Sequence, residues 1–462
     1  MTPRPLAWIA QATGGELRGR DCAINAVVTD TRALPKGKAA LFVALKGEHF
    51  DGHDHVQAAA DGGCVAALVS RAVAADIKQV VVADSERALG DFAAAVQRER
   101  ATRVLAITGS NGKTSVKALL LSILDKIGGA HATPGNRNNQ IGLPLAVLDA
   151  PEDARFAVYE MGAGKLGDIA YLAAIARPDI ALVNNIAPAH LERMGSLLGV
   201  ADTKAAIYDA LRPDGVAVIN ADDAFAPYFL ERASGRRVLR FGLEATADIQ
   251  ARGIAADADG SRFQLVAPQG ATDINLPMPG RHSVRNALAA AAMALGVGAT
   301  LEQVRAGLNA AQPVAGRLIP HRLRSGAVLV DDSYNANPGS VDAAIDTLAA
   351  SGAEAWLVLG DMRELGADEV ALHAQAGTRA SAAGIKRLYT LGTLSKSAAD
   401  AFGAGARHFE NHAELAHALC AELRAGVHLL VKGSRGSAMD RIVTLLLLAD
   451  SASAEEGEAG AA

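Results

Sequence analysis

The sequence predicts an α/β protein of three domains, and three observations support this prediction. The chain has 462 residues, whereas one hydrophobic core usually serves roughly 100 to 200 residues. From Val104 onward, short apolar runs alternate with glycine-containing turns and stretches of helical period, which is typical of βα units around a parallel sheet. A second series of the same kind begins near Ala311. The residues before the first series form a third unit.

The element boundaries follow from the same patterns. The predicted units and the terminal segment are 1–98, 99–312, 313–450 and 451–462. We expect the last of these, which is small and acidic, to be disordered. In the first unit, the sequence predicts a strand at 40–45 and a helix at 86–99. The junctions at 98–102 and 309–316 are the expected hinges.

The strands of the second and third units are nearly continuous in apolar residues, as expected for parallel strands that are covered on both faces. We expect them at 104–108, 156–160, 180–184, 216–220, 328–330, 356–359, 388–391 and 429–431. Residues 242–279, with alternation at 262–267, predict an antiparallel hairpin appended to the central unit. Ligands of such folds bind beyond the carboxyl ends of the parallel strands, where the polar residues of this chain cluster.

Composition excludes several classes of protein. Half of the residues are hydrophobic and 21% are charged, so the chain is globular rather than disordered. The net charge of −5 gives no general attraction to nucleic acid or anionic lipid. A signal peptide and a long apolar span are both missing from the sequence, which predicts a cytoplasmic protein. Cys22, Cys64 and Cys420 show no metal or disulfide spacing.

The strongest local motif is AITGSNGKTS at residues 106–115. An apolar strand runs into a glycine turn, and Lys113 and Thr114 begin a helix. Gly109 and Gly112 can take positive φ so that backbone N–H groups close on phosphate oxygens at the helix N-terminus. Lys113 would neutralise phosphate charge, and the Thr114 hydroxyl would ligate Mg²⁺. The motif is the short form GxxGKT, and it predicts nucleotide binding.

Three further residues follow predicted strands of the same sheet. Glu160 ends the strand at 156–160 and is a natural Mg²⁺ ligand, although a strand-end carboxylate can also be merely solvated. His190 follows the strand at 180–184, where a lone histidine is usually structural. Lys204 reads as an exposed helix lysine.

Taken together, TGSNGKT at 108–114, Glu160, His190, Lys204, HSVRN at 282–286 and DSYNANP at 332–338 resemble the Mur ligases in order and spacing. The resemblance covers essentially the whole chain. It implies an N-terminal domain for the UDP end of the substrate, a central P-loop ATPase with a parallel sheet, and a Rossmann-like C-terminal domain. It also implies a monomer that uses ATP to phosphorylate a substrate carboxylate, which an amine then attacks.

The resemblance assigns roles that the residue types alone do not. It implies that Lys204 is carbamoylated and supports a second Mg²⁺ with His190, while the first lies on Thr114 and Glu160. Arg317 would deliver a cation to the γ-phosphate. Lys113, Glu160, His190, Lys204 and Arg317 are therefore the predicted catalytic residues. The nucleotide would contact Gly109, Ser110, Asn111, Gly112, Lys113, Thr114, Asn286, Arg317, Asp332, Tyr334 and Asn335.

The other substrates are matched by further segments. TDTR at 29–32, LFVALKG at 41–47 and TPGNRNNQIGLP at 133–144 resemble segments that the family uses around uridine diphosphate and its sugar. In the first, Thr31 replaces the usual serine and keeps the hydroxyl. The predicted substrate contacts are Thr31, Arg32, Lys46, Gly47, Asn138, Asn139, Lys432 and Ser434.

The C-terminal motifs point to one substrate class within the family. DDSYNANPGS at 331–340 and LGDMRELG at 359–366 resemble members that add D-alanyl-D-alanine to UDP-N-acetylmuramoyl-tripeptide, giving the pentapeptide, ADP and phosphate. The DNPR string expected of the diaminopimelate-adding relative is missing. Two alternatives remain: a ligase that adds diaminopimelate or lysine, and a nucleotide-binding relative without ligase activity.

Overall fold

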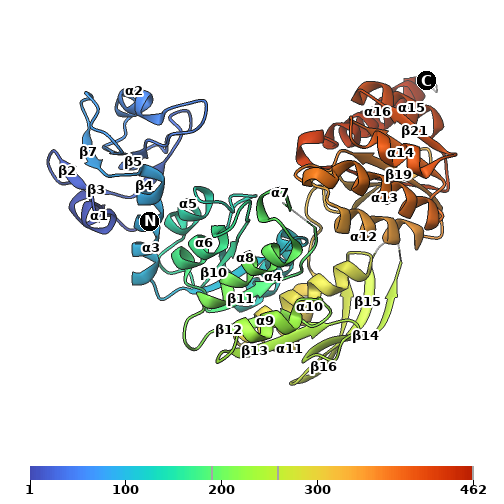
Figure 1. Cartoon of the computed structure of the whole chain (residues 1–462), viewed down its shortest axis with the longest axis horizontal. Helices are drawn as coiled ribbons and strands as arrows, with labels where there is room; N and C mark the ends of the chain where they lie inside the picture. The colour runs from blue at the N-terminus through green and yellow to red at the C-terminus, as the bar shows by residue number, and fades with distance from the viewer. Residues whose placement is uncertain (189–190, 258–259, 460–462) are drawn as a thin grey trace.

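The computed structural model describes residues 1–188, 191–257 and 260–459. Within these residues the larger sheets have five, nine and six strands. Figure 1 shows three bodies in a row, with the N-terminal and C-terminal ones on either side of the central one. The predicted α/β class with a parallel central sheet is confirmed. The domain limits at 98 and 312 stay predictions.

The N-terminal sheet has the order β2-β7-β6-β5-β4, and its strands are parallel except for β2. Its elements are β1 Arg4–Pro5, α1 Leu6–Thr13, β2 Glu16–Arg18, β3 Ala23–Ile24, β4 Ala26–Val28, β5 Ala40–Val43, η1 Gly52–His55, α2 Val56–Asp61, β6 Ala66–Val69, β7 Lys78–Val81 and α3 Ser85–Glu99. The last helix begins where the Asp84 carboxylate accepts hydrogen bonds from two N–H groups of the first turn.

The junction after α3 is tightly packed. Phe92 and Val96 of α3 belong to the same buried cluster as Leu143 and Leu172 of the central domain. The guanidinium of Arg100, which is 7% exposed, donates hydrogen bonds to the carbonyl oxygens of Val147 and Ala150. These contacts oppose rotation at 98–102, so we retain only 309–316 as an expected hinge.

Replacing Arg100 with alanine should lower the free energy of unfolding by about 2–4 kcal/mol, because the buried carbonyl oxygens of Val147 and Ala150 each lose a bond from the guanidinium. Chemical denaturation measures this change. Arg98→Ala is the matched control, since Arg98 is exposed two residues earlier. Equal stability of the two variants would show that the buried contacts of Arg100 do not hold the junction.

The central sheet has the order β16-β15-β14-β13-β12-β11-β8-β10-β9. Its strands are β8 Arg103–Thr108, β9 His131–Ala132, β10 Phe156–Glu160, β11 Ile180–Val183, β12 Val216–Asn220, β13 Arg237–Gly242, β14 Ile249–Ala256, β15 Ser261–Ala267 and β16 Gly270–Leu276. The four strands that we predicted for this unit are confirmed. The segment at 242–279 is antiparallel as predicted, and β14 to β16 extend the hairpin to three strands.

Helices cover both faces of this sheet. They are α4 Lys113–Leu124, η2 Asp125–Ile127, α5 Gly142–Asp149, α6 Asp168–Ala176, α7 Leu191–Met194, α8 Leu197–Asp209, α9 Ala226–Arg232, α10 Arg281–Gly296 and α11 Leu301–Asn309. Side chains of β8 alternate between the two layers: Leu105 and Ile107 pack with α4 and α10, whereas Val104 and Ala106 pack with α5, α6 and α8. The strand is therefore buried on both sides, and its carboxyl end opens at the phosphate loop.

The C-terminal sheet has the order β17-β18-β22-β19-β20-β21 and is parallel except for the edge strand β17. Its elements are β17 Ile319–Arg322, β18 Val328–Asp332, α12 Pro338–Ala349, β19 Glu354–Gly360, η3 Gly366–Asp368, α13 Glu369–Ala382, β20 Arg387–Leu391, α14 Lys396–Phe402, β21 Ala406–Phe409, α15 His412–Glu422, β22 Val427–Lys432, η4 Arg435–Ser437 and α16 Asp440–Ala459. The strands predicted for this unit are confirmed.

The C-terminal segment begins inside α16, which the structure describes as far as Ala459, and the disorder predicted for 451–462 stays a prediction.

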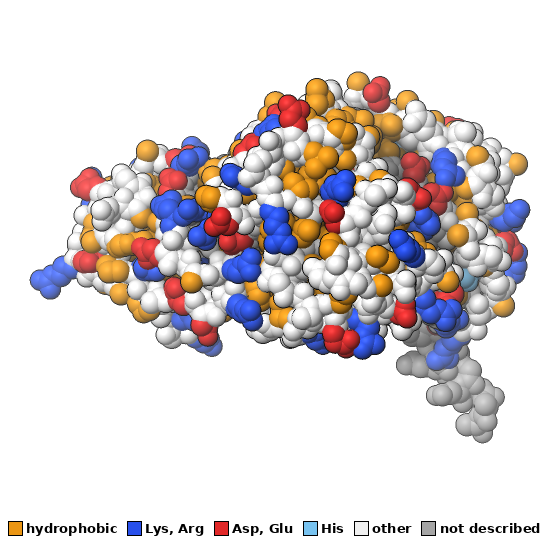
Figure 2. Space-filling view, turned by 90° about the horizontal axis from the view of Figure 1, so that it is seen from below, with side chains coloured by type: hydrophobic (Ala, Val, Ile, Leu, Met, Phe, Trp, Pro, Cys, Tyr) orange, Lys and Arg blue, Asp and Glu red, His pale blue; other side chains and the backbone are white. Residues whose placement is uncertain are grey.

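The surface matches the balanced composition. Figure 2 shows lysine and arginine side chains interspersed with acidic ones over the face it presents, without one large basic area. Among the described residues, no helix is long and apolar enough to cross a bilayer.

Candidate active site

The phosphate loop lies between β8 and α4, and its glycines are required. Gly109 and Gly112 have φ values of 144° and 79°. A Cβ atom on Gly112 would come within 2.6 Å of the Asn184 and Asn286 side-chain amides, so a larger residue could not occupy this position. The prediction of positive φ at both glycines is confirmed.

The loop is held by the segment that follows β11. The Ser110 amide donates to the Asn185 carbonyl oxygen at 2.9 Å, and the Asn111 amide donates to the Asn185 side-chain oxygen at 2.8 Å. The Ser110 hydroxyl donates to the Ala187 carbonyl oxygen at 3.0 Å. The backbone amides of Ser110 and Asn111 are therefore already hydrogen-bonded. The N–H groups in the first turn of α4 have no intrahelical partners, so they are the donors that can bind an anion.

Lys113 lies inside the loop. Its ammonium donates to the Gly109 carbonyl oxygen at 2.7 Å. Burial lowers the pKa of Lys113; the Glu160 carboxylate opposes this shift and Arg317 adds to it. Arg317 of the C-terminal domain lines the same cavity as the phosphate loop.

Glu160 is the buried carboxylate of the site, and it is 2% exposed. One oxygen accepts a hydrogen bond from the Thr114 hydroxyl at 3.1 Å, and the other accepts one from the Asn138 amide at 2.9 Å. Burial would raise the pKa of Glu160, but Lys117 and Lys113 outweigh burial and hold this pKa below its ordinary value. The carboxylate is therefore charged, and one of its oxygens lies beside the Thr114 hydroxyl.

These two oxygen donors fit Mg²⁺, which usually takes one or two carboxylates together with phosphate and water oxygens. Among the described residues, no group of three His, Cys, Asp or Glu side chains could form a complete metal cage. A nucleotide phosphate would complete such a site. Of the other predicted metal ligands, His190 lies outside the described residues.

Lys204 is not the exposed helix lysine that its sequence context suggested. Its side chain on α8 is 2% exposed and reaches the main cavity. Within the described part of the chain, no carboxylate forms an ion pair with it. Burial, with a smaller effect of Lys113, lowers the pKa of Lys204 to about 7. A large fraction of this amine is therefore neutral near neutral pH.

The main cavity, with a volume of about 830 Å³, lies between the central and C-terminal domains. It brings together predicted residues from both: Gly109, Ser110, Asn111, Gly112, Lys113, Thr114, Asn138, Asn139, Glu160, Lys204, Arg317, Tyr334, Asn335 and Ser434. The guanidinium of Arg317 lies 4.3 Å from the centre of the Tyr334 ring. The Ser434 hydroxyl is buried and has no hydrogen-bond partner among the described residues.

A second cavity of about 280 Å³ adjoins the loop on the side of α10. Asn286, Asp332 and Lys432 line it, and Arg317 borders both cavities. The predicted nucleotide contacts are therefore divided between the two cavities: Asn286 and Asp332 line the second one, and Tyr334 and Asn335 line the main one.

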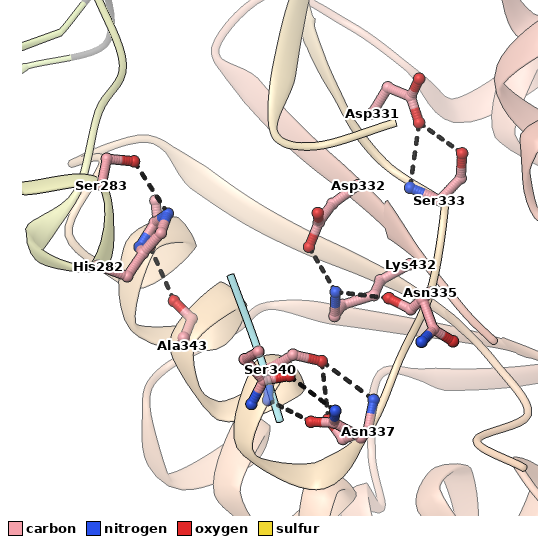
Figure 3. A network of polar contacts seen from close by, with 12 residues as sticks. His282, Ser283, Asp331, Asp332, Ser333, Asn335, Asn337, Ser340, Ala343 and Lys432 are labelled. Carbon is pink, nitrogen blue, oxygen red and sulfur yellow. Dashed lines mark hydrogen bonds and ion pairs between the residues drawn. The ribbon is translucent and has the colours of Figure 1, made fainter. Parts of the chain in front are cut away.

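Asp332 and Lys432 form a buried ion pair at the ends of β18 and β22, with 2.6 Å between Nζ and Oδ2 (Figure 3). The Lys432 ammonium also donates to the Asn335 carbonyl oxygen at 2.9 Å. Burial raises the pKa of Asp332 and Lys432 opposes this. Lys432 thus holds the segment that carries Asn335. Lys432 itself does not line the main cavity, whereas Ser434 does.

The predicted N-terminal contacts do not line either cavity. Thr31 and Arg32 follow β4, and Lys46 and Gly47 follow β5. Because β4 and β5 are parallel neighbours, both pairs lie beyond the same edge of the N-terminal sheet. The Arg32 guanidinium pairs with Asp30 at 2.7 Å and is exposed.

Two contacts at the site were missed by sequence reasoning. Lys117 lies 3.2 Å from the Glu160 carboxylate; its spacing of three and four residues from Thr114 and Lys113 on one helix could have indicated it. Asn337 caps α12 and donates a hydrogen bond to the Asn111 side-chain oxygen at 2.7 Å. No local signal could have revealed this contact between domains.

Comparisons with known proteins agree with this arrangement. Residues 107–294 match the Mur ligase middle domain, and residues 316–435 match the Mur ligase, glutamate ligase domain. The chain is 44% identical over 445 residues to the UDP-N-acetylmuramoyl-tripeptide--D-alanyl-D-alanine ligase of Escherichia coli K12, which covers 96% of this chain and 98% of that relative.

Two solved structures share the whole fold. MurF from Acinetobacter baumannii has a TM-score of 0.91 at 33% identity and covers 96% of this chain and 99% of its own. MurF ligase from Thermotoga maritima, solved in complex with ADP, has a TM-score of 0.83 at 26% identity and covers 92% and 97%. The chain therefore belongs to the Mur ligase family.

Proposed function

We propose that the chain is an ATP-dependent ligase that joins D-alanyl-D-alanine to UDP-N-acetylmuramoyl-tripeptide, giving the pentapeptide precursor of peptidoglycan, ADP and phosphate. The observation that carries the proposal is the main cavity, where the phosphate loop and Glu160 face Arg317 of the C-terminal domain. The names of the relatives support the choice of substrates. ADP in the Thermotoga maritima relative supports the choice of nucleotide.

The three parts of the chain divide the work. Residues 1–98 bind the UDP end, with Thr31, Arg32, Lys46 and Gly47 at the edge beyond β4 and β5. Residues 99–312 bind ATP, and residues 313–450 close over it. Asn286 and Asp332, in the smaller cavity, hold the adenosine side.

In the first step, a carboxylate oxygen of the tripeptide attacks the γ-phosphorus of ATP. The new O–P bond forms as the bond from phosphorus to the β-phosphate bridging oxygen breaks, and ADP leaves. Lys113 and Arg317 stabilise the charge on the transferring group. Mg²⁺ on Thr114 and Glu160 would neutralise phosphate charge.

In the second step, the amine of D-alanyl-D-alanine attacks the carbonyl carbon of the acyl phosphate. The amide C–N bond forms, the C–O bond to phosphate breaks, and the amine loses a proton. Asn138 and Asn139, the expected donors to the sugar or diphosphate, line the same cavity as Glu160. Enclosure between two domains brings three substrates together.

Lys204 would supply the second anionic group as a carbamate, and it would hold a second Mg²⁺ together with His190, which lies outside the described residues. Its neutral amine attacks the carbon of CO₂: an N–C bond forms, the π bond of one C=O breaks so that the two oxygens become a carboxylate, and the nitrogen loses a proton. Burial beside Lys113, with a pKa of about 7, favours the neutral amine that this reaction needs.

Phosphate release tests the proposal. Purified protein is incubated with UDP-N-acetylmuramoyl-tripeptide, ATP and Mg²⁺, and D-alanyl-D-alanine is compared with diaminopimelate and with lysine. We expect release with the dipeptide and formation of the pentapeptide by mass spectrometry. Release with a single amino acid instead would establish the diaminopimelate- or lysine-adding activity. ATP binding without release in any mixture would indicate a non-catalytic relative.

A further inference from the structure

Lys117 is a buried cation next to the phosphate loop that the mechanism above does not use. It lies on α4, is 6% exposed, and lines neither cavity. Its ammonium has three acceptors: the carbonyl oxygens of Thr133 and Gly135, at 3.0 and 2.9 Å, and the Glu160 carboxylate at 3.2 Å. Because a lysine ammonium has three N–H donors, these contacts use its whole hydrogen-bonding capacity.

The acceptors belong to two segments with separate tasks. Thr133 and Gly135 begin the segment at 133–144, here called the substrate loop, which carries the cavity-lining Asn138 and Asn139. Glu160 ends β10 and is the proposed metal carboxylate. Lys117 therefore links both segments to the helix that starts at the phosphate loop.

Further bonds close this link into a ring. The Asn138 amide of the substrate loop donates to the second Glu160 oxygen at 2.9 Å, and the Glu160 backbone amide donates to the Thr133 hydroxyl at 3.1 Å. The Gly162 amide donates to the Asn138 carbonyl oxygen at 2.8 Å. The first half of the loop, from Thr133 to Asn138, is thus fixed relative to the carboxylate, and Lys117 is the one cation in this ring.

We propose that Lys117 is a positioning residue that holds the substrate loop and Glu160 at fixed positions relative to α4. The uridine-linked peptide and the metal-bound nucleotide are then aligned by the same helix. The inference rests on the proposed function. Lys117 acts through the groups it orients, because it does not reach the space where substrates bind.

The first test is steady-state kinetics of Lys117→Met, which keeps most of the apolar length of the side chain and removes the charge and donors. We expect the KM for UDP-N-acetylmuramoyl-tripeptide and the Mg²⁺ concentration for half-maximal activity both to rise, by roughly 10–100-fold, as is typical when a partner of a ligand is removed. Lys117→Arg, which keeps a cation with several donors, should restore part of both values. Lys126→Met is the control, because Lys126 is exposed on η2.

A second test is needed if Lys117→Met folds poorly, because this variant leaves the Glu160 charge buried without its cation. Glu160→Gln and Lys117→Met/Glu160→Gln carry no such charge, and calorimetry compares how tightly they bind UDP-N-acetylmuramoyl-tripeptide. Weaker binding by the double variant supports the inference. Equal binding by the two, or kinetics of Lys117→Met equal to those of Lys126→Met, overturns it. Lack of phosphate release by the unmodified enzyme would instead refute the proposed function.

Discussion

Replacing Arg317 with methionine should lower kcat by roughly 10³-fold or more, the range seen when a cation that contacts a transferring phosphoryl group is removed. Arg317 borders both cavities and lies over the Tyr334 ring, which fixes the direction of its guanidinium. It lines the same cavity as Lys113 of the phosphate loop, where the phosphates of a nucleotide would lie. Because the contact strengthens as charge develops, KM for ATP should change much less than kcat.

Phosphate-release kinetics with saturating substrates measure this effect. Arg317→Lys should retain part of the activity, since it keeps the charge but loses the planar fork and the ring contact. Arg324→Met, an exposed position of the same domain, is the control. A loss in kcat smaller than about tenfold for Arg317→Met would remove Arg317 from the phosphoryl-transfer step.

Replacing Lys204 with methionine should lower kcat by roughly 10²-fold or more, because the site loses a charged group next to the reacting phosphate. The unmodified enzyme, depleted of CO₂, should regain activity on addition of bicarbonate, whereas Lys204→Met should not respond. The buried position of Lys204 at the main cavity and its pKa of about 7 are the reasons for this expectation.

The pH dependence of this recovery has a definite sign. Burial lowers the pKa of Lys204, so its amine is protonated increasingly as the pH falls through about 7. A protonated amine cannot attack CO₂, and the bicarbonate concentration needed for recovery should therefore rise as the pH falls. Full activity of Lys204→Met with no bicarbonate response in either protein would refute carbamoylation.

Local patterns were sufficient for the parts of this protein that are continuous in sequence. The apolar runs that became β8, β10, β11 and β12 were recognisable because a parallel strand covered on both faces has few polar residues. The phosphate loop was recognisable because its glycines, Lys113 and Thr114 are consecutive, and the positive φ values of Gly109 and Gly112 follow from the same stretch.

Patterns were insufficient where partners are distant in sequence. Lys204 reads as a solvated helix residue, and only the packing of α8 against the sheet buries it. Arg100 lies in a polar junction for which the sequence predicts a hinge. Its guanidinium instead donates hydrogen bonds to the carbonyl oxygens of Val147 and Ala150, at the end of α5. Asp332 and Lys432 were assigned to different ligands, and only the register of β18 and β22 shows that they also pair with each other.

The sequence by itself therefore determined the α/β class, the strands of the two parallel sheets and the phosphate loop, because periodicity and glycine turns act over a few neighbouring residues. Tertiary structure alone decided which polar groups meet: Asn111 with Asn337, which is 226 residues away, and Lys117 with Glu160 and the substrate loop. The physical reason is that such contacts depend on strand order and domain placement, which bring the carboxyl ends of separate strands to one crevice.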